Sequence, residues 1–132
     1  MSYTYSEKSK QKLATVDPRL QRVFNEVIKY YDHTIICGKR TLAEQQEAYD
    51  KGFSKLKPGQ SKHNVEPLSL AVDAAPYPID WTDYYSFYHF AGFVLGIASG
   101  LGIHLRWGGD WDSDHDLKDQ TFMDLGHFEL KD

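Results

Sequence analysis

The chain has 132 residues, of which 41% are hydrophobic and 26% are charged, and its formal net charge is -4. This length and composition fit one compact domain, residues 1–132, with enough chain to build its own core. The negative charge and the lack of a basic run argue against a nucleic-acid-binding protein.

The first third of the chain predicts a helix and a strand. Residues 1–16 are polar, hold at most a short helical turn and lack an apolar stretch of signal-peptide length. Asp17-Pro18 is typical of a helix start, and apolar residues follow it at spacings of three and four as far as Tyr31. Thr34–Cys37 is a β-branched run that favours a strand. Cys37 is the single cysteine, so no internal disulfide is expected, and we interpret it as a small buried side chain.

The middle of the chain predicts a second helix and a second strand. Thr41 and Glu44 have the spacing of a capping box, which starts a helix over Leu42–Lys51 that ends at Gly52. A polar loop follows, and Ser69–Ala74 has the alternation of a strand. In that strand Asp73 points away from the apolar face that carries Val72. A carboxylate in mid-strand is costly to bury unpaired, so a metal ion or a cation is its natural partner.

The C-terminal half predicts a third helix over Tyr84–Gly100, strands over Ile103–Trp107 and Gly126–Leu130, and an acidic loop over 110–121. Glycines 92, 96 and 100 recur every four residues, which predicts close packing of that helix face on a neighbouring element. The most hydrophobic segment, 87–101, is too short to span a bilayer, so we expect no stable membrane insertion. Helices interleaved with short strands favour an α+β fold, a small antiparallel sheet with flanking helices.

Two of the six histidines stand out because each has a carboxylate nearby in the sequence. His63 lies in a loop that runs into the strand holding Asp73, and His127 follows Asp124 by three residues. Two imidazoles and one carboxylate suffice to hold a catalytic zinc ion with one position left for water. Zinc lowers the pKa of that water to roughly 7, and a neighbouring carboxylate, here Asp124, is needed to take its proton.

Four stretches carry a resemblance to a known family: GKRTLAEQQEAYDKG at 38–52, SKHN with LAVDAAPYP at 61–78, GIHLRWGGDWD at 102–112 and DLGHFEL at 124–130. In this order they resemble phage endolysin peptidases that cleave between L-alanine and D-glutamate in peptidoglycan. Those peptidases share a metal core with D-Ala-D-Ala carboxypeptidases, vancomycin-resistance dipeptidases and the hedgehog domain. The resemblance implies a hedgehog/DD-peptidase-like fold, one Zn2+ ion per chain and peptidoglycan peptide stems as the substrate.

The resemblance also implies roles for individual residues. It makes His63, Asp73 and His127 the zinc ligands and Asp124 the general base. Arg40 matches an arginine that binds a substrate carbonyl and stabilises the oxyanion. The remaining matches are expected to line the cleft or to form a wall of the peptide groove: Ser61, Gln45, Trp107 and Trp111.

The sequence departs from the simplest family pattern at two places. Nine residues separate His63 from Asp73, and the extra residues, around 64–69, are expected to form a loop. Glu129 lies two residues beyond His127, on the same face of a strand. It is either a partner that orients an imidazole or a structural acid.

The acidic loop has two interpretations. Asp110, Asp112 and Asp114 alternate like the opening of a calcium loop, which would make Ca2+ a regulator. However, His115 and Thr121 stand where an EF-hand needs glycine and glutamate, so a merely solvated acidic loop is the alternative.

Three functions therefore fit the sequence. The leading hypothesis is a zinc-dependent peptidoglycan hydrolase, an endolysin that cleaves the L-Ala–D-Glu bond and lyses the host cell. A D,D-carboxypeptidase or dipeptidase would use the same zinc site, and a non-catalytic, zinc-stabilised binding domain is the third reading. We expect a monomer without a signal peptide, held in the host bacterial cytoplasm until it is released to the wall.

Overall fold

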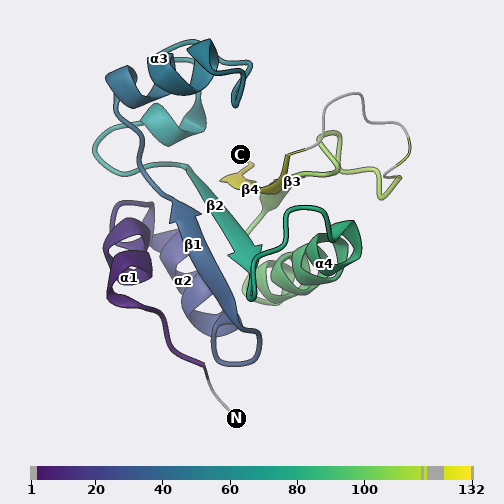
Figure 1. Cartoon of the computed structure of the whole chain (residues 1–132). Helices are drawn as coiled ribbons and strands as arrows, with labels where there is room; N and C mark the ends of the chain where they lie inside the picture. The colour runs from purple at the N-terminus through teal and green to yellow at the C-terminus, as the bar shows by residue number, and fades with distance from the viewer. Residues whose placement is uncertain (1–2, 117, 119–123, 132) are drawn as a thin grey trace.

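The computed structural model describes residues 3–116, 118 and 124–131, which form a four-stranded sheet surrounded by helices (Figure 1). The sheet order is β1-β2-β4-β3, and each neighbouring pair is antiparallel, so the predicted α+β class is confirmed. The strands are β1 (His33–Cys37), β2 (Ala71–Pro76), β3 (Leu105–Gly108) and β4 (Asp124–Leu130). The helices are α1 (Glu7–Leu13), α2 (Pro18–Val27), α3 (Leu42–Asp50) and α4 (Tyr84–Gly100), with a short 3-10 helix, η1 (Lys62–Asn64).

Local capping signals fix where the helices begin. The Asp17 side chain accepts a hydrogen bond from the Arg19 amide at the start of α2, and Thr41 and Glu44 form the predicted capping box of α3. Gly52, just beyond α3, has a φ of 77°, a backbone conformation that glycine adopts without strain. Residues 7–13 form a full helix, which is more than the short turn predicted there.

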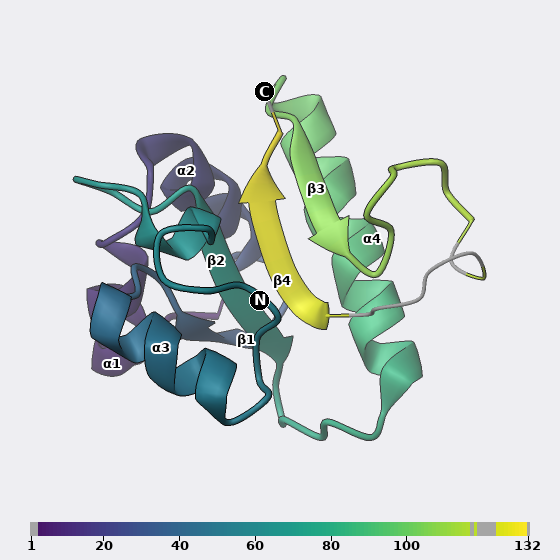
Figure 2. The ribbon, with the colours of Figure 1, turned by 90° about the horizontal axis from the view of Figure 1, so that it is seen from above.

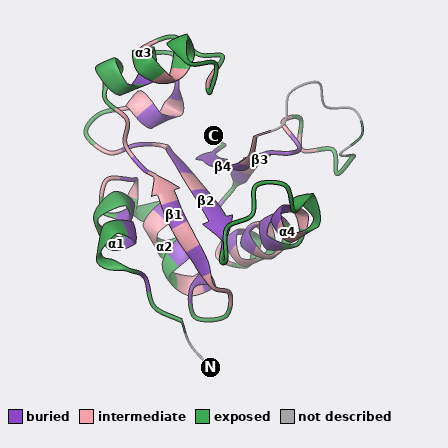
Figure 3. Cartoon of the chain, in the orientation of Figure 1, coloured by how far each residue is buried: buried purple, intermediate pink, exposed green. Residues whose placement is uncertain are grey.

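The hydrophobic core lies between one face of the sheet and helices α2 and α4. Figure 3 shows buried residues along β2 and along the inner side of α4. Phe128 on β4 packs edge-on against Phe24 of α2 and Phe90 of α4, with ring centroids 5.6 and 6.1 Å apart. Burying such a side chain contributes roughly 1.5–3 kcal/mol, so this aromatic cluster helps to hold the sheet and both helices in register.

The glycine repeat of α4 does not pack on a neighbouring element, so that prediction is wrong. Gly92, Gly96 and Gly100 are exposed, and a Cβ atom added at any of them would meet nothing within 4 Å. The spacing places them on one helix face, but that face points to solvent, because the core is covered by the stripe that includes Phe90 and Val94.

The acidic loop is only partly described, because residues 117 and 119–123, among them Thr121, lie outside the described residues. Among the residues that are described, no helix is both long enough and apolar enough to cross a bilayer.

Candidate metal centre and active site

The sheet register places three polar side chains in one row on the face opposite the core. Asp73 on β2 is the direct partner of Cys37 on β1 and of His127 on β4. Because side chains alternate along a strand, these residues point away from the core face that carries Val72 and Phe128. The predicted orientation of Asp73 relative to Val72 therefore agrees with the structure.

The 3-10 helix η1 delivers His63 to this row. The Ser61 side chain caps η1 by accepting the His63 amide, and the His63 carbonyl accepts the Arg40 amide at 2.8 Å. The imidazole Nδ1 donates to the Gly38 carbonyl at 2.7 Å, since a carbonyl only accepts. Nε2 is thereby turned towards Asp73 Oδ1, 3.2 Å away. The loop expected after His63 is present, because β2 begins only at Ala71.

His127 is held in a similar way by Glu129. Its Nδ1 lies 3.0 Å from Asp73 Oδ1, and its Nε2 donates to Glu129 Oε1 at 2.8 Å. Glu129 also accepts from Arg106 at 2.7 Å and pairs with Lys62 at 3.4 Å. Of the two interpretations of Glu129, the contact with His127 supports the orienting partner.

The donor set fits a metal ion. One nitrogen of each imidazole faces the same carboxylate oxygen, and the other nitrogen is fixed by Gly38 or Glu129. Two oriented imidazoles with a carboxylate match the protein ligands of a catalytic zinc, and the hydrogen bonds behind them match the outer partners of such sites. Donor atoms of Asp73, Asp124 and His127 lie within 4.8 Å of one another, as do those of Cys37, His63 and Asp73.

Charge in the metal-free site favours protonated imidazoles around an ionised carboxylate. Burial would lower the pKa of His63, but the charge and hydrogen bond of Asp73 raise it to about 10. Burial would likewise lower the pKa of His127, but its hydrogen bonds to the Asp73 and Glu129 carboxylates raise it to about 9. Although burial works against ionisation of Asp73, the two histidines hold its pKa well below the usual range. A metal ion must displace these protons, so its binding depends on pH.

Asp124 lies at the start of β4, within reach of the same centre. Burial and the charge of Asp73 raise the pKa of its carboxyl, while His127, His63 and Arg40 work in the opposite direction. A carboxylate with a raised pKa is a better proton acceptor near neutral pH. Gly108 allows this placement, because a Cβ atom there would lie 2.1 Å from the Asp124 carbonyl oxygen.

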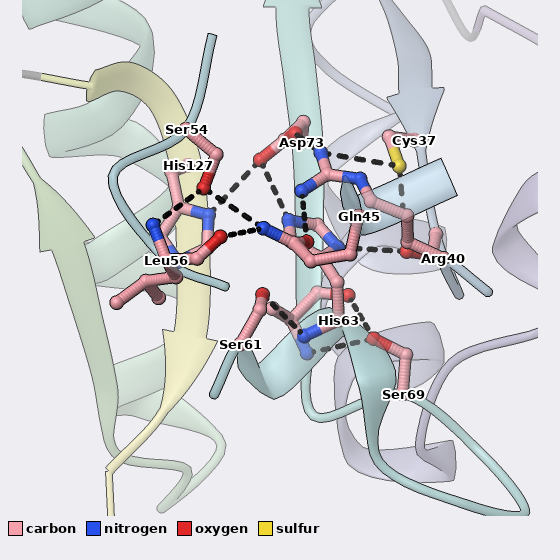
Figure 4. A network of polar contacts seen from close by, with 12 residues as sticks. Cys37, Arg40, Gln45, Ser54, Leu56, Ser61, His63, Ser69, Asp73 and His127 are labelled. Carbon is pink, nitrogen blue, oxygen red and sulfur yellow. Dashed lines mark hydrogen bonds and ion pairs between the residues drawn. The ribbon is translucent and has the colours of Figure 1, made fainter. Parts of the chain in front are cut away.

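Arg40 is held beside Asp73 by Gln45 of α3 (Figure 4). Its guanidinium donates to Gln45 Oε1 at 2.7 Å and lies 3.6 Å from Asp73 Oδ2. Gln45 also donates to Ser54 Oγ and the Leu56 carbonyl, which ties the loop after α3 to the site. The Gln45 side chain is 0% exposed, so it supports Arg40 from behind rather than lining an open surface.

The other residues predicted to contact substrate fall in different places. Ser61 is buried and caps η1. Trp107 is only 4% exposed, and its indole donates to the Leu125 carbonyl inside the core, so its burial argues against a place in a groove wall. Trp111 is half-buried, with its ring centroid 5.4 Å from that of His127, so it lies at the site.

The prediction that Cys37 is a small buried side chain is wrong. It is half-buried, and its Sγ lies 3.8 Å from an Arg40 nitrogen, because the bulge at the end of β1 turns it towards the site.

An aromatic pocket beside Asp124 was missed by sequence reasoning. Its cavity measures about 460 Å3, and it is lined by Trp81, Tyr84, Phe87, Tyr88 and the first three residues of β4. The helix pattern indicated only that Phe87 is buried, and nothing in the sequence indicated that β4 would lie against these rings.

The acidic loop brings its three aspartates together. Donor oxygens of Asp110, Asp112 and Asp114 lie within 4.8 Å of one another. Asp110 is buried and accepts the amides of Asp114 and His115, which curls the loop around it.

The chain matches known proteins over nearly its full length. The family model "Phage L-alanyl-D-glutamate peptidase" matches residues 1–131. The L-alanyl-D-glutamate peptidase of Escherichia phage T5 is 37% identical over 139 aligned positions, covering 98% of this chain and 99% of that protein. The crystal structure of the Serratia marcescens L-Ala D-Glu endopeptidase ChiX superposes with a TM-score of 0.75 at 26% identity, covering 96% of this chain and 89% of that one. The chain therefore belongs to the phage L-alanyl-D-glutamate peptidase family.

Proposed function

We propose that this chain is a zinc-dependent endolysin that cleaves the L-alanyl–D-glutamate bond of peptidoglycan stems and so lyses the host cell. The observation that carries the proposal is the convergence of His63 Nε2 and His127 Nδ1 on Asp73 Oδ1, with Asp124 beside them. Relatives named as L-alanyl-D-glutamate peptidases support the choice of bond.

The proposed division of roles follows from the contacts. His63, Asp73 and His127 hold the metal, which when bound supplies a Lewis acid and a water with a pKa near 7. Asp124 accepts the proton of the attacking water and passes it to the departing amine of D-glutamate. Arg40, fixed by Gln45, donates hydrogen bonds to the carbonyl oxygen of L-alanine as negative charge develops there. Trp111, whose ring is tilted by 39° against that of His127, covers one side of the centre.

Digestion of purified peptidoglycan tests the bond and the metal together. Zinc-loaded protein is expected to release peptides that begin with D-glutamate and to leave L-alanine on the glycan, as read by mass spectrometry. A chelator should stop release, and zinc should restore it. Release of terminal D-alanine would indicate a D,D-carboxypeptidase instead, and binding without any product would indicate a non-catalytic domain.

Asp124→Asn separates catalysis from folding. This variant is expected to bind zinc as the wild type does but to lose about 10²–10⁴-fold in rate, because it can no longer accept a proton. Asp50→Asn, at an exposed position of α3, is the matched control and should keep full activity. Equal activity of Asp124→Asn and the wild type would remove Asp124 from the proposed mechanism.

Calcium regulation is a separate proposal, supported by the proximity of the Asp110, Asp112 and Asp114 carboxylates. Because clustered oxygens are the ligands that Ca2+ prefers, Asp112→Asn should abolish calcium binding measured by calorimetry on zinc-loaded protein. A wild-type chain that takes up no calcium would leave the loop as a solvated acidic segment.

A further inference from the structure

The aromatic pocket presents a flat, fixed platform next to the proposed proton acceptor. The Trp81 ring stacks on Phe87, with centroids 5.4 Å apart and planes 23° from parallel. Phe87 is buried, whereas Trp81 and Tyr84 are 58% and 57% exposed. One face of the Trp81 ring is therefore anchored to the protein, and the cavity of about 460 Å3 has the size of a small-molecule subsite.

The surroundings of the aromatic pocket favour a neutral ligand. Asp80 and Asp83 flank Trp81 in the sequence, and Asp124 lines the cavity. The sequence has no lysine or arginine between Lys62 and Arg106, a stretch that includes the four aromatic residues of the pocket. The described residues that line the cavity include the carboxylate of Asp124 and no lysine or arginine, so a ligand with carboxylates would meet like charge at the wall of the pocket.

On the other side of the proposed metal centre from the aromatic pocket, the nearby side chains include basic ones. There the guanidinium of Arg40 lies beside Asp73, and the loop tied to Gln45 carries exposed Lys55 and Lys57. Figure 2 shows α3 and the N-terminal end of α4 on opposite sides of β2 and the start of β4. A substrate that crosses the centre therefore passes from Arg40 and the lysines of the loop after α3 to an aromatic, acidic side.

The chemistry of the stem matches this polarity. Beyond the scissile bond, the D-glutamate part of the stem carries free carboxylates, which suit the side with Arg40, Lys55 and Lys57. Before it stands a single L-alanine, whose nitrogen is joined in an amide to the lactyl group of N-acetylmuramic acid. Since one residue spans only about 3.5 Å, a neutral N-acetylated sugar follows almost directly on the cleaved bond.

We propose that the aromatic pocket binds the N-acetylmuramoyl group on the L-alanine side of the scissile bond. This inference rests on the proposed function and adds a specificity determinant to it: the protein selects stems that are still attached to glycan. Trp81 offers the sugar its free ring face, and the hydroxyl groups of Tyr84 and Tyr88 offer hydrogen bonds.

Two synthetic substrates test the inference on zinc-loaded protein. The first is N-acetylmuramoyl-L-Ala-γ-D-Glu-meso-diaminopimelate, and the second is the same tripeptide with an N-acetyl group, which keeps the amide and lacks the sugar. The wild type is expected to show a kcat/KM at least about tenfold higher on the first. Trp81→Ala should bring this ratio close to one, whereas Tyr77→Ala, a 63% exposed aromatic residue that does not line the pocket, should leave the ratio unchanged.

The outcomes separate the two proposals. Equal wild-type rates on both substrates, or an unchanged ratio in Trp81→Ala, would overturn the sugar subsite while leaving the peptidase function intact. Absence of cleavage at L-Ala–D-Glu in both substrates would overturn the proposed function and this inference together.

Binding without turnover gives an independent readout. Titration of the methyl glycoside of N-acetylmuramic acid N-methylamide, in which the lactyl carboxyl is an amide as it is in the stem, into the wild type should shift the NMR signal of the Trp81 indole N–H, assigned by its loss in Trp81→Ala. The backbone amide signal of Leu13 on α1, which is buried and does not line the pocket, is the internal control and should not move. A Trp81 signal that stays fixed, or that moves only together with that of Leu13, would refute the subsite.

Discussion

His33 is expected to make the folded chain sensitive to mild acid. Its imidazole is 4% exposed and lies among the rings of Tyr5, Phe24 and Phe90, with centroids 5.0, 5.8 and 5.0 Å away. Nδ1 donates to the Tyr31 carbonyl at 2.7 Å. Burial lowers the pKa of His33 from 6.5 to about 4, although the hydrogen bond to Tyr31 works in the opposite direction. The folded chain therefore keeps this imidazole neutral at a pH where the unfolded chain charges it.

The size of the effect follows from the two pKa values. Below a pH of about 6.5 the unfolded chain takes up a proton at His33, while the folded chain resists protonation down to about pH 4. The stabilisation is complete above the higher value and is lost as the pH falls towards the lower one. A gap of about 2.5 corresponds to about 3.4 kcal/mol in full, of which about 2 kcal/mol is lost between pH 8 and pH 5.

Urea unfolding of the wild type and of His33→Phe at these two pH values measures the effect. Both proteins are kept in chelator, so that release of a metal in acid does not contribute. Phenylalanine fills the site but cannot titrate, and the loss of the hydrogen bonds with the Tyr31 carbonyl and the Tyr5 hydroxyl costs roughly 1–3 kcal/mol each at either pH. The wild type should therefore lose about 2 kcal/mol more than the variant on going from pH 8 to pH 5. Equal losses in the two proteins would show that His33 is not the acid-sensitive group.

Three further predictions follow from the contacts. Glu129→Gln should weaken zinc binding about 10–100-fold in calorimetry, because it loosens the hydrogen bond that orients His127. Glu47→Gln, on the exposed face of α3, is the control and should leave zinc affinity unchanged. Equal zinc affinities of Glu129→Gln and the wild type would contradict the orienting role. Gly96→Ala should raise the free energy of unfolding by roughly 0.5–1 kcal/mol, because the added Cβ meets nothing within 4 Å. Gly108→Ala should lower the free energy of unfolding, because its Cβ would clash with Asp124. A destabilised Gly96→Ala would mean that the glycine face of α4 is packed after all. Arg40→Lys should reduce kcat about 10²–10³-fold at unchanged zinc content, because the planar fork held by Gln45 is lost; a change in KM alone would assign Arg40 to substrate binding only.

The elements that the sequence predicted well are those fixed by short-range signals. Asp17-Pro18 and the Thr41–Glu44 capping box act within one helical turn, so the starts of α2 and α3 agree with the structure. The glycine repeat of α4 failed for a related reason. Periodicity tells which residues share a helix face, but only the tertiary structure tells what that face meets.

In the site, too, some features could be predicted from the sequence and others depend on tertiary structure. The ligand set came from family resemblance together with residue chemistry, and the structure brings those side chains to one centre. The two tryptophans could not be separated beforehand, because their difference lies in strand pairing. Trp107 is the partner of Phe128 on β4 and is buried, with its indole bonded to the Leu125 carbonyl, whereas Trp111 follows the end of β3 and its ring lies against that of His127. The pocket around Trp81 depends on the placement of β4 beside α4, which no local pattern encodes.

Strand register links the stability of the fold to the chemistry of the site. Asp73 and His127 are direct cross-strand partners, and their neighbours Val72 and Phe128 are direct partners on the core face. A slip of one residue would bury the carboxylate and the imidazole among apolar side chains and expose Val72 and Phe128. The cost of burying an unpaired charge would add to the loss of aromatic packing with Phe24 and Phe90. The hydrophobic core thus selects the one register in which β2 and β4 present Asp73 and His127 side by side, and η1 adds His63 to this pair.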